Sequence, residues 1–284
     1  PHFPTSPPPP PIAQSDYTRL LSSVLPVRHV PKLHPRKAIP AKVFCDAPDA
    51  EGSFISLLDD LGGASLAVLR PAPLERLPLA ACLFSLCYRL VALLPKALVR
   101  SVVLAPLFEL AACLLVSCRD GEPLEPMFDF LAAYGNHARR GQEGEPAALS
   151  AQLQAAVGGR VGEGLVRALL QGVADTLPVG LVPRVGDILA PLLHAESWRG
   201  CIGPWAHAAL GQIPVQEGVP DPATCTALLQ VLGGIPDPYE GGNMHLARLD
   251  ALREAVMGFA RVCRRMQSAA DFELACYDWK PQEQ

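Results

Sequence analysis

Residues 62–67, GGASLA, contain the serine whose surroundings come nearest to those of a catalytic nucleophile. A nucleophile elbow has the pattern G-x-S-x-G and holds its serine on a sharp turn between a strand and a helix. Gly63 and Ser65 fit this pattern, but Ala67 stands where the second glycine is needed, and no strand pattern precedes the serine. We therefore do not assign a catalytic role to Ser65.

A second glycine-rich stretch and a pair of aspartates have residue types that serve phosphate and metal chemistry. In residues 158–172, GGRVGEGLVRALLQG, Gly162 and Gly164 lack both a third glycine at the required step and a preceding strand that would aim a helix end at a phosphate. We interpret them as a loosened helix start. Asp59 and Asp60 would need further partners for metal binding or acid–base chemistry, and the sequence provides none beside them. We interpret them as the solvated end of a helix.

The histidines and cysteines lack the spacing of a metal site. The seven histidines are scattered, and the nine cysteines form no C-x-x-C pair. Buried free thiols in a reducing compartment explain best the cysteines in apolar runs, which are Cys82, Cys87, Cys113 and Cys118. The histidines in or beside expected helices are interpreted as surface or hydrogen-bonded side chains, and they are His137, His194, His207 and His245.

Two groups of side chains have both a structural interpretation and a binding interpretation. Trp198 and Trp205 are seven residues apart, so they share one face of an unbroken helix. Core packing between helices is the structural interpretation, and an exposed anchor for a partner is the alternative. Arg261, Arg264 and Arg265 form a basic patch near a helix end, where cations suit the helix dipole. The alternative for this patch is the binding of an acidic or phosphorylated partner.

The sequence thus predicts no catalytic, cofactor-binding or metal-ligating residue and no cofactor, and we expect the chain not to be an enzyme. The formal net charge is −4 at pH 7. Residues 1–50 hold six Lys and Arg against three Asp and Glu, and the rest of the chain holds 18 against 25. Neither part has the strong basic excess of a nucleic-acid binder, so we expect no direct contact with nucleic acid.

The most apolar stretch is SVVLAPLFELAACLLVSC at residues 101–118, and it bears on the class of fold. A membrane-spanning helix needs about 20 apolar residues. This run is shorter, contains Pro106 and carries a charge at Glu109, and a carboxylate near mid-bilayer costs about 2.5–3.5 kcal/mol. We therefore predict no membrane contact. The run is too long for a strand, so we expect a helix from about Pro106 to Cys118 with neighbours on several sides.

Helical periodicity recurs on both sides of this stretch. Residues 127–134, MFDFLAAY, place large apolar side chains at i, i+3, i+4 and i+7, one face of a helix that Gly135 is expected to end. Asp221 and Pro222 have the types of an N-cap and a first helical residue. Residues 62–73 are expected to be a loop. The other expected helices are 16–25, 51–61, 77–94, one that starts at 145–146, 165–177, 181–195, 197–213 and a long last helix that includes 246–263.

No strand pattern competes with these helices. Grouped in pairs, the helices form units of roughly 35–55 residues, near the ~40–47 residue period of HEAT and armadillo repeats. Each pair in such an array must stack on the next to bury its apolar face. We therefore predict an all-α fold, a HEAT/armadillo-like α-solenoid of antiparallel helix pairs with a Pro-rich, irregular N-terminal segment.

The chain is expected to have three parts. Residues 1–50 are Pro-rich and largely irregular, residues 51–268 form the helical repeats, and residues 269–284 are a C-terminal tail. The basic run RHVPKLHPRK at 28–37 is interpreted as part of a solvated tail, with a localisation or anion-binding patch as the alternative. The chain begins PHFPTSPPPPP without Met or a signal-peptide pattern, and we interpret this start as the edge of a fragment or of an incomplete gene model.

Several segments resemble the C-terminal region of the importin-thirteen and transportin-three branch of the importin-β superfamily. Residues 82–118, a proline-ended helix, a short Leu/Arg helix and a Pro-initiated apolar helix, resemble one repeat of that branch, and EPMFDFLAAYGN at 125–136 resembles its next helix. Residues 159–214 are similar to the penultimate region. The matching residues there are Leu169, Leu170, Leu177, Pro178, Val185, Leu189, Trp205, Leu210 and Pro214. The last helix, with Arg264 and Arg265, resembles the terminal one.

The resemblance covers roughly residues 80–268 and implies a nuclear transport receptor, a karyopherin-β built from HEAT repeats. Such receptors bind protein cargo, in this branch including Arg/Ser-rich splicing factors, contact nucleoporins, and exchange cargo in response to the GTP-bound GTPase Ran. Ran binds N-terminal repeats that this chain lacks. The implied function is Ran-dependent transport, mainly import, with the protein in nucleus and cytoplasm. The alternative is a HEAT-repeat scaffold of another pathway. No cargo-binding residue is transferred by the resemblance.

Overall fold

The computed structural model of the chain describes residues 50–140, 147–195, 198–215, 220–234 and 244–278. The chain divides after Asp46, and all the described residues lie in the unit Ala47–Gln284. The helix expected at 16–25 and the Pro-rich segment around it lie outside the described residues, so those expectations stay predictions.

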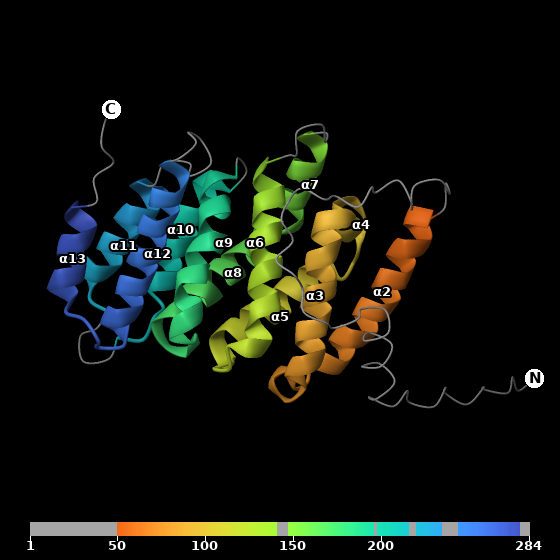
Figure 1. Ribbon diagram of the computed structural model, residues 1–284, viewed down its shortest axis with the longest axis horizontal. Coiled ribbons are helices and arrows are strands. Elements are labelled where there is room, and N and C mark those ends of the chain that lie inside the picture. Colours follow the sequence, from red (N-terminus) through yellow and green to blue (C-terminus); the bar gives the residue numbers. More distant parts are fainter. Residues whose placement is uncertain (1–49, 141–146, 196–197, 216–219, 235–243, 279–284) are drawn as a thin grey trace, which may run out of the picture. The chain divides into compact units, whose positions relative to one another are not determined.

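Every regular element in the described residues is a helix, which confirms the all-α class (Figure 1). The α-helices are α2 (Ala50–Leu69), α3 (Leu77–Leu93), α4 (Pro95–Arg100), α5 (Leu104–Ser117), α6 (Glu125–Arg140), α7 (Ala147–Ala156), α8 (Arg160–Gln171), α9 (Val182–His194), α10 (Arg199–Leu210), α11 (Pro222–Gly234), α12 (Met244–Cys263) and α13 (Ala269–Asp278). Short 3-10 turns are η2 (Pro73–Arg76), η3 (Glu122–Leu124) and η5 (Val179–Leu181), and η4 (Gly172–Thr176) is a π-helix.

Two rows of helices account for most of the packing in the unit Ala47–Gln284. In the first row α3 packs on α6, α6 on α9 and α9 on α12, so each helix contacts the helix three positions further along the chain (Figure 1). In the second row α5 packs on α8, α8 on α10, α10 on α11 and α11 on α13. The shorter helices α4 and α7 also contact each other, and α7 packs on α6.

A cluster of buried aromatic rings joins the two rows. Phe84 of α3, Phe108 of α5, and Phe130 and Tyr134 of α6 have ring centroids 5.0–6.0 Å apart in their contacting pairs. Tilted and edge-on ring pairs of this kind add about 0.5–1.5 kcal/mol each beyond the burial of their surface. The apolar face predicted for residues 127–134 is therefore confirmed, and it forms the centre of the core.

The apolar stretch 101–118 forms α5, which buries most of its surface. The buried side chains of α5 are Leu104, Leu107, Phe108, Leu110, Ala111, Leu114 and Leu115. Glu109 lies on the exposed side, 4.0 Å from Arg70 in the turn after α2, and both side chains are about two-thirds exposed. This exposed ion pair contributes little, about 0–1 kcal/mol. The prediction of a core helix with neighbours on several sides is confirmed.

Helix α2 is longer than expected, because the loop predicted for residues 62–73 is helical as far as Leu69. Glycine weakens a helix by about 0.5–1 kcal/mol, but Gly62 is buried against Val103, and a Cβ at this position would lie 2.6 Å from Val103 Cγ2. Ser65 donates a hydrogen bond to the carbonyl of Leu61 within the same helix. Tertiary contact therefore outweighs the low helix propensity of the Gly62–Gly63 pair.

Two further expectations about helix ends are wrong. Helix α6 continues past Gly135 to Arg140, because Gly135 serves a close contact: its added Cβ would lie 2.9 Å from Pro191 Cγ of α9. The segment 269–284, predicted as a tail, contains α13, which packs on α11 and α12 through the buried Phe272. Neither contact has a local signal, because both partners are remote in sequence.

Two segments have the length and composition of a membrane span, Gly52–Leu69 and Pro73–Leu93, while the apolar helix Leu104–Ser117 is shorter. A helix that is apolar on all sides occurs both in membranes and in the interior of water-soluble proteins. Within this structure 28% of the first segment and 39% of the second are buried. The prediction of no membrane contact stays a prediction.

Candidate functional site

The residues that came nearest to catalytic motifs have structural roles. Ser65 is 1% exposed, and its hydroxyl donates a hydrogen bond to the Leu61 carbonyl. Gly162 lies in α8 against the ring of Trp205, where an added Cβ would be 2.8 Å from ring carbons. Asp59 accepts hydrogen bonds from the hydroxyl of Ser101 and the backbone N–H of Val102, which fixes α2 to the turn before α5. The expectation that Asp59 is solvated is therefore wrong, because its carboxylate is bonded to another part of the chain. The sequence does not indicate this contact, since the partners lie more than 40 residues away.

Both tryptophans pack within the unit, as the structural interpretation predicted. Trp198 is 3% exposed and donates its indole N–H to the carbonyl of Gln154 at 3.0 Å, which ties the start of α10 to α7. Trp205 is half-buried against Gly162 of α8.

The eight described cysteines are free thiols, and their exposure varies. Cys87 and Cys118 are buried, as expected, and Cys82 is half-buried. Cys113 is exposed, so the expected burial is wrong for this residue, because it lies on the outer side of α5. Burial raises the pKa of Cys87 to about 12, which keeps that thiol protonated and unreactive at neutral pH.

Metal-ligating side chains do not converge in the described parts of the chain, where no group of three or more His, Cys, Asp or Glu could hold a metal ion. His207 is exposed on α10, and His137 of α6 is half-buried. His245 lies in α12 with a side chain outside the described set.

The structure separates the three arginines that the sequence grouped as one basic patch. Arg261 lines a groove between α12 and α13, whereas Arg264 and Arg265 line a cavity on a different side of the end of α12. Helix α12 ends at Cys263, and Arg265 has φ 58°, in the left-handed region that non-glycine residues rarely adopt. Arg261, inside the helix, therefore faces one site, and the two arginines after the helix end face the other.

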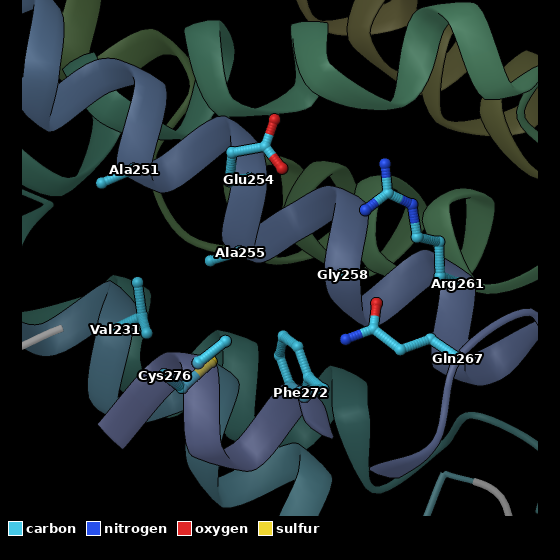
Figure 2. Close-up of a pocket in the computed structure, with 10 residues that line it drawn as sticks. Val231, Ala251, Glu254, Ala255, Gly258, Arg261, Gln267, Phe272 and Cys276 are labelled. Atoms are coloured by element: carbon cyan, nitrogen blue, oxygen red, sulfur yellow. The ribbon is translucent and has the colours of Figure 1, made fainter. Parts of the chain in front are cut away.

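The groove between α12 and α13 is small and largely apolar (Figure 2). It has a volume of about 200 Å³, and its lining includes Val231 of α11, Phe272 and Cys276 of α13, and the charged residues Glu254 and Arg261 of α12. In Figure 2 the charged groups of Glu254 and Arg261 project away from Phe272. The groove therefore offers an apolar floor below a rim with one charge of each sign.

The second site, which we name the arginine cavity, lies where α5, η4, α10 and α12 end. It has a volume of about 500 Å³. The residues that line it are Val116, Gln171, Ala174, Asp175, Thr176, Gln212, Ile213, Pro214, Pro220, Cys263, Arg264 and Arg265. Nearby, Asp175 forms an exposed ion pair with Arg119 at 3.6 Å.

Arg264 connects the end of α12 to η4 at the floor of this cavity. Its Nη2 donates to the carbonyls of Val173 at 3.0 Å and Leu177 at 2.7 Å, which are groups left over at a helix end. Burial lowers the pKa of Arg264, and the nearby Arg119 acts in the same direction while Asp175 opposes it.

The π-helix η4 lines the same cavity, and no sequence pattern predicts it. Gly172 touches the end of α5, where an added Cβ would lie 2.7 Å from the Leu115 carbonyl, and Thr176 donates its hydroxyl to that carbonyl at 2.7 Å. Single-turn π-helices often occur at functional sites. The one sequence feature that points to this cavity is the pair Arg264 and Arg265 after α12. Only the fold determines where this pair lies relative to η4.

Comparisons of the chain with protein-family models, with curated proteins and with solved structures find no significant match.

Proposed function

We propose that this chain is a protein-binding α-solenoid of the HEAT or armadillo type, without catalytic activity, and that it forms the C-terminal part of a nuclear transport receptor. The observation that carries the proposal is the packing of α3 on α6, α6 on α9 and α9 on α12. Stacking of equivalent helices from successive units is how repeat proteins build one continuous core and an extended surface for partners.

Receptor function is supported by the resemblance of residues 80–268 to the importin-thirteen and transportin-three branch. On this proposal the helical surface binds protein cargo, such as Arg/Ser-rich splicing factors. Ran and nucleoporins would be partners of the complete receptor, with Ran contacting N-terminal repeats outside this chain, and the protein would move between cytoplasm and nucleus. On this proposal the protein only binds its partners. Binding of GTP-loaded Ran must therefore lower the affinity for cargo if Ran is to release it.

The alternative function is a repeat scaffold that serves another pathway. The short helices α4 and α7 favour it, because each lies in the chain between the helices of a pair and makes a three-helix unit. Armadillo repeats have three helices, whereas HEAT repeats have two. Both functions use the same stacked helices and differ in partner.

The test is affinity capture with the complete protein from nuclear and cytoplasmic extracts, with GTP-loaded or GDP-loaded Ran added. Release of a bound protein by the GTP form alone supports the import receptor. Retention of that protein with both forms supports the scaffold of another pathway. Capture of no protein above the level of an unrelated helical control contradicts both functions.

A further inference from the structure

The arginine cavity contains a half-buried guanidinium, that of Arg264, which forms no ion pair with a carboxylate among the described residues. The two hydrogen bonds of Arg264 go to the neutral carbonyls of Val173 and Leu177. Its Nε is buried and has no hydrogen-bond partner among the described residues. Removing a charge from water is costly unless it is paired, and unsatisfied buried donors are rare in native proteins. Arg264 therefore holds a half-buried positive charge at the cavity, near Asp175 and Arg119, with one donor that has no partner among the described residues.

The backbone beside this charge belongs to the end of α12. Arg265 adopts φ 58°, and its side chain lines the same cavity. The Arg265 N–H bonds the Val262 carbonyl and the Met266 N–H bonds the Arg261 carbonyl, which is the Schellman pattern that commonly ends a helix with a residue at positive φ. The π-helix η4 lines the cavity through Ala174, Asp175 and Thr176, and single-turn π-helices often occur at functional sites. A helix end that carries two arginines and a π-helix thus meet at one cavity.

The charges around the cavity have an excess of positive sign among the described residues. Arg264 and Arg265 line it with a single carboxylate, Asp175, which is itself in an ion pair with Arg119. The volume of about 500 Å³ falls within the range of roughly 300–1,000 Å³ typical of binding pockets. The cavity is therefore large enough for a side chain and its neighbours from another protein.

We propose that the arginine cavity binds a carboxylate side chain from an acidic segment of a protein partner. This inference rests on the proposed protein-binding function and names the chemistry that one part of the surface recognises. Guanidinium groups bind carboxylates through paired, charge-assisted hydrogen bonds. The apolar walls at Val116, Ile213 and Pro214 fit an apolar residue next to the carboxylate residue. A free inorganic anion has no such apolar neighbour, so the cavity fits a peptide segment better.

Fluorescence anisotropy of a fluorescein-labelled hexaglutamate peptide with the full chain tests the proposal. We expect saturable binding, at least about tenfold weaker in Arg265→Gln because one charge-assisted contact is lost. Gln212→Glu places a negative charge on an exposed rim residue and should weaken binding similarly. The matched control Arg261→Gln removes an exposed charge four residues earlier, outside the cavity, and should change affinity less than about twofold.

Several results would overturn the proposal. These are no saturable binding of hexaglutamate, equal binding of a hexaglutamine peptide, equal loss in Arg261→Gln and Arg265→Gln, or displacement by inorganic phosphate at constant ionic strength. Helix content and thermal midpoint check that Arg265→Gln folds, and if it does not, Gln212→Glu decides. Protein capture that is unchanged in Arg265→Gln rejects this inference alone. Hexaglutamate binding without any protein capture rejects the proposed function alone.

Discussion

Tyr134 joins α6 to α7 through a buried hydrogen bond, since its hydroxyl donates to the Leu153 carbonyl at 2.6 Å. We predict that Tyr134→Phe lowers the free energy of unfolding by about 1–3 kcal/mol, because a buried acceptor loses its donor. Urea denaturation measures this change. Tyr88→Phe is the matched control, because Tyr88 is 41% exposed, and an equal loss in the two variants would show that the hydrogen bond to α7 contributes nothing.

Buried thiols make the stability of the chain depend on alkaline pH. Burial raises the pKa of Cys87 to about 12, and the pKa of Cys263 reaches about 12 through burial and the nearby Cys225. In the unfolded chain these thiols lose their protons near the ordinary value of about 8.5. The unfolded state then binds fewer protons than the native state, so stability falls as pH rises above that value.

We predict that Cys87→Ala makes this decline shallower, by up to about 1.4 kcal/mol per pH unit. Urea denaturation between pH 8 and pH 10 gives the slope. Cys113→Ala, at an exposed position of α5, controls for the substitution itself. Parallel curves for the wild type and Cys87→Ala would contradict the assignment of a buried, protonated thiol.

At the scale of elements, close packing of α8 on α10 depends on one glycine. An added Cβ at Gly162 would lie 2.6 Å from the Val157 carbonyl oxygen and 2.8 Å from the ring of Trp205. We predict that Gly162→Ala destabilises the chain by about 1–3 kcal/mol through overpacking. Gly164, two residues further along α8, has no atom within 4 Å of an added Cβ, so Gly164→Ala should stabilise by about 0.5–1 kcal/mol. Thermal unfolding of both variants should show shifts of opposite sign, and shifts of equal sign would contradict this packing.

The start of α11 depends on Asp221, whose carboxylate accepts a hydrogen bond from the Thr224 backbone N–H at 2.7 Å. This bond lowers the pKa of Asp221 below its ordinary value. We predict that Asp221→Ala costs about 0.5–2 kcal/mol at pH 7. Because the folded pKa is lowered, the carboxylate contributes above the ordinary pKa and loses its effect as pH falls through the folded value.

Asp221→Asn separates the hydrogen bond from the charge, since an amide oxygen still accepts from the backbone. It should retain most of the stability at pH 7. Denaturation curves of Asp221→Ala and the wild type should converge near pH 2, and a constant difference at all pH values would contradict the pKa shift.

The sequence was sufficient to predict elements whose signal is local. The apolar periodicity of 127–134, the Asp221-Pro222 cap and the apolar run that became α5 all depend on neighbours within a few residues. The extension of α2 through Gly62, the continuation of α6 through Gly135 and the helix α13 depend on residues far along the chain. Sequence rules treat glycine as a helix breaker, whereas Gly62 and Gly135 permit close approach to Val103 and Pro191.

The candidate site could not be predicted for the same reason. Arg264 and Arg265 were recognised as a basic pair, but η4 is about 90 residues away, as the separation of Arg264 from Val173 records. The π-helix itself has no sequence pattern that distinguishes it from the end of an ordinary helix. Only the fold brings the two arginines to the carbonyls and apolar walls that make a cavity.

At the scale of the whole molecule, the stacking of helices three positions apart supports both the fold and the proposed function. Contact between α6 and α9 is the clearest case, because Gly135 lies directly against Pro191. If α6 packs on α9 as described, the stability cost of a substitution at Gly135 in α6 must depend on the residue at position 191 in α9. This dependence distinguishes a stacked array from helices that fold independently.

A double-mutant cycle on Gly135 and Pro191, followed by urea denaturation, tests this stacking most directly. We predict that Gly135→Ala costs about 1–3 kcal/mol in the wild type, because the new methyl group overlaps the Pro191 ring. In the Pro191→Ala background that cost should fall by at least about 1 kcal/mol, since the ring is gone. Costs that are equal in the two backgrounds would mean that α6 and α9 do not touch, and would contradict the account.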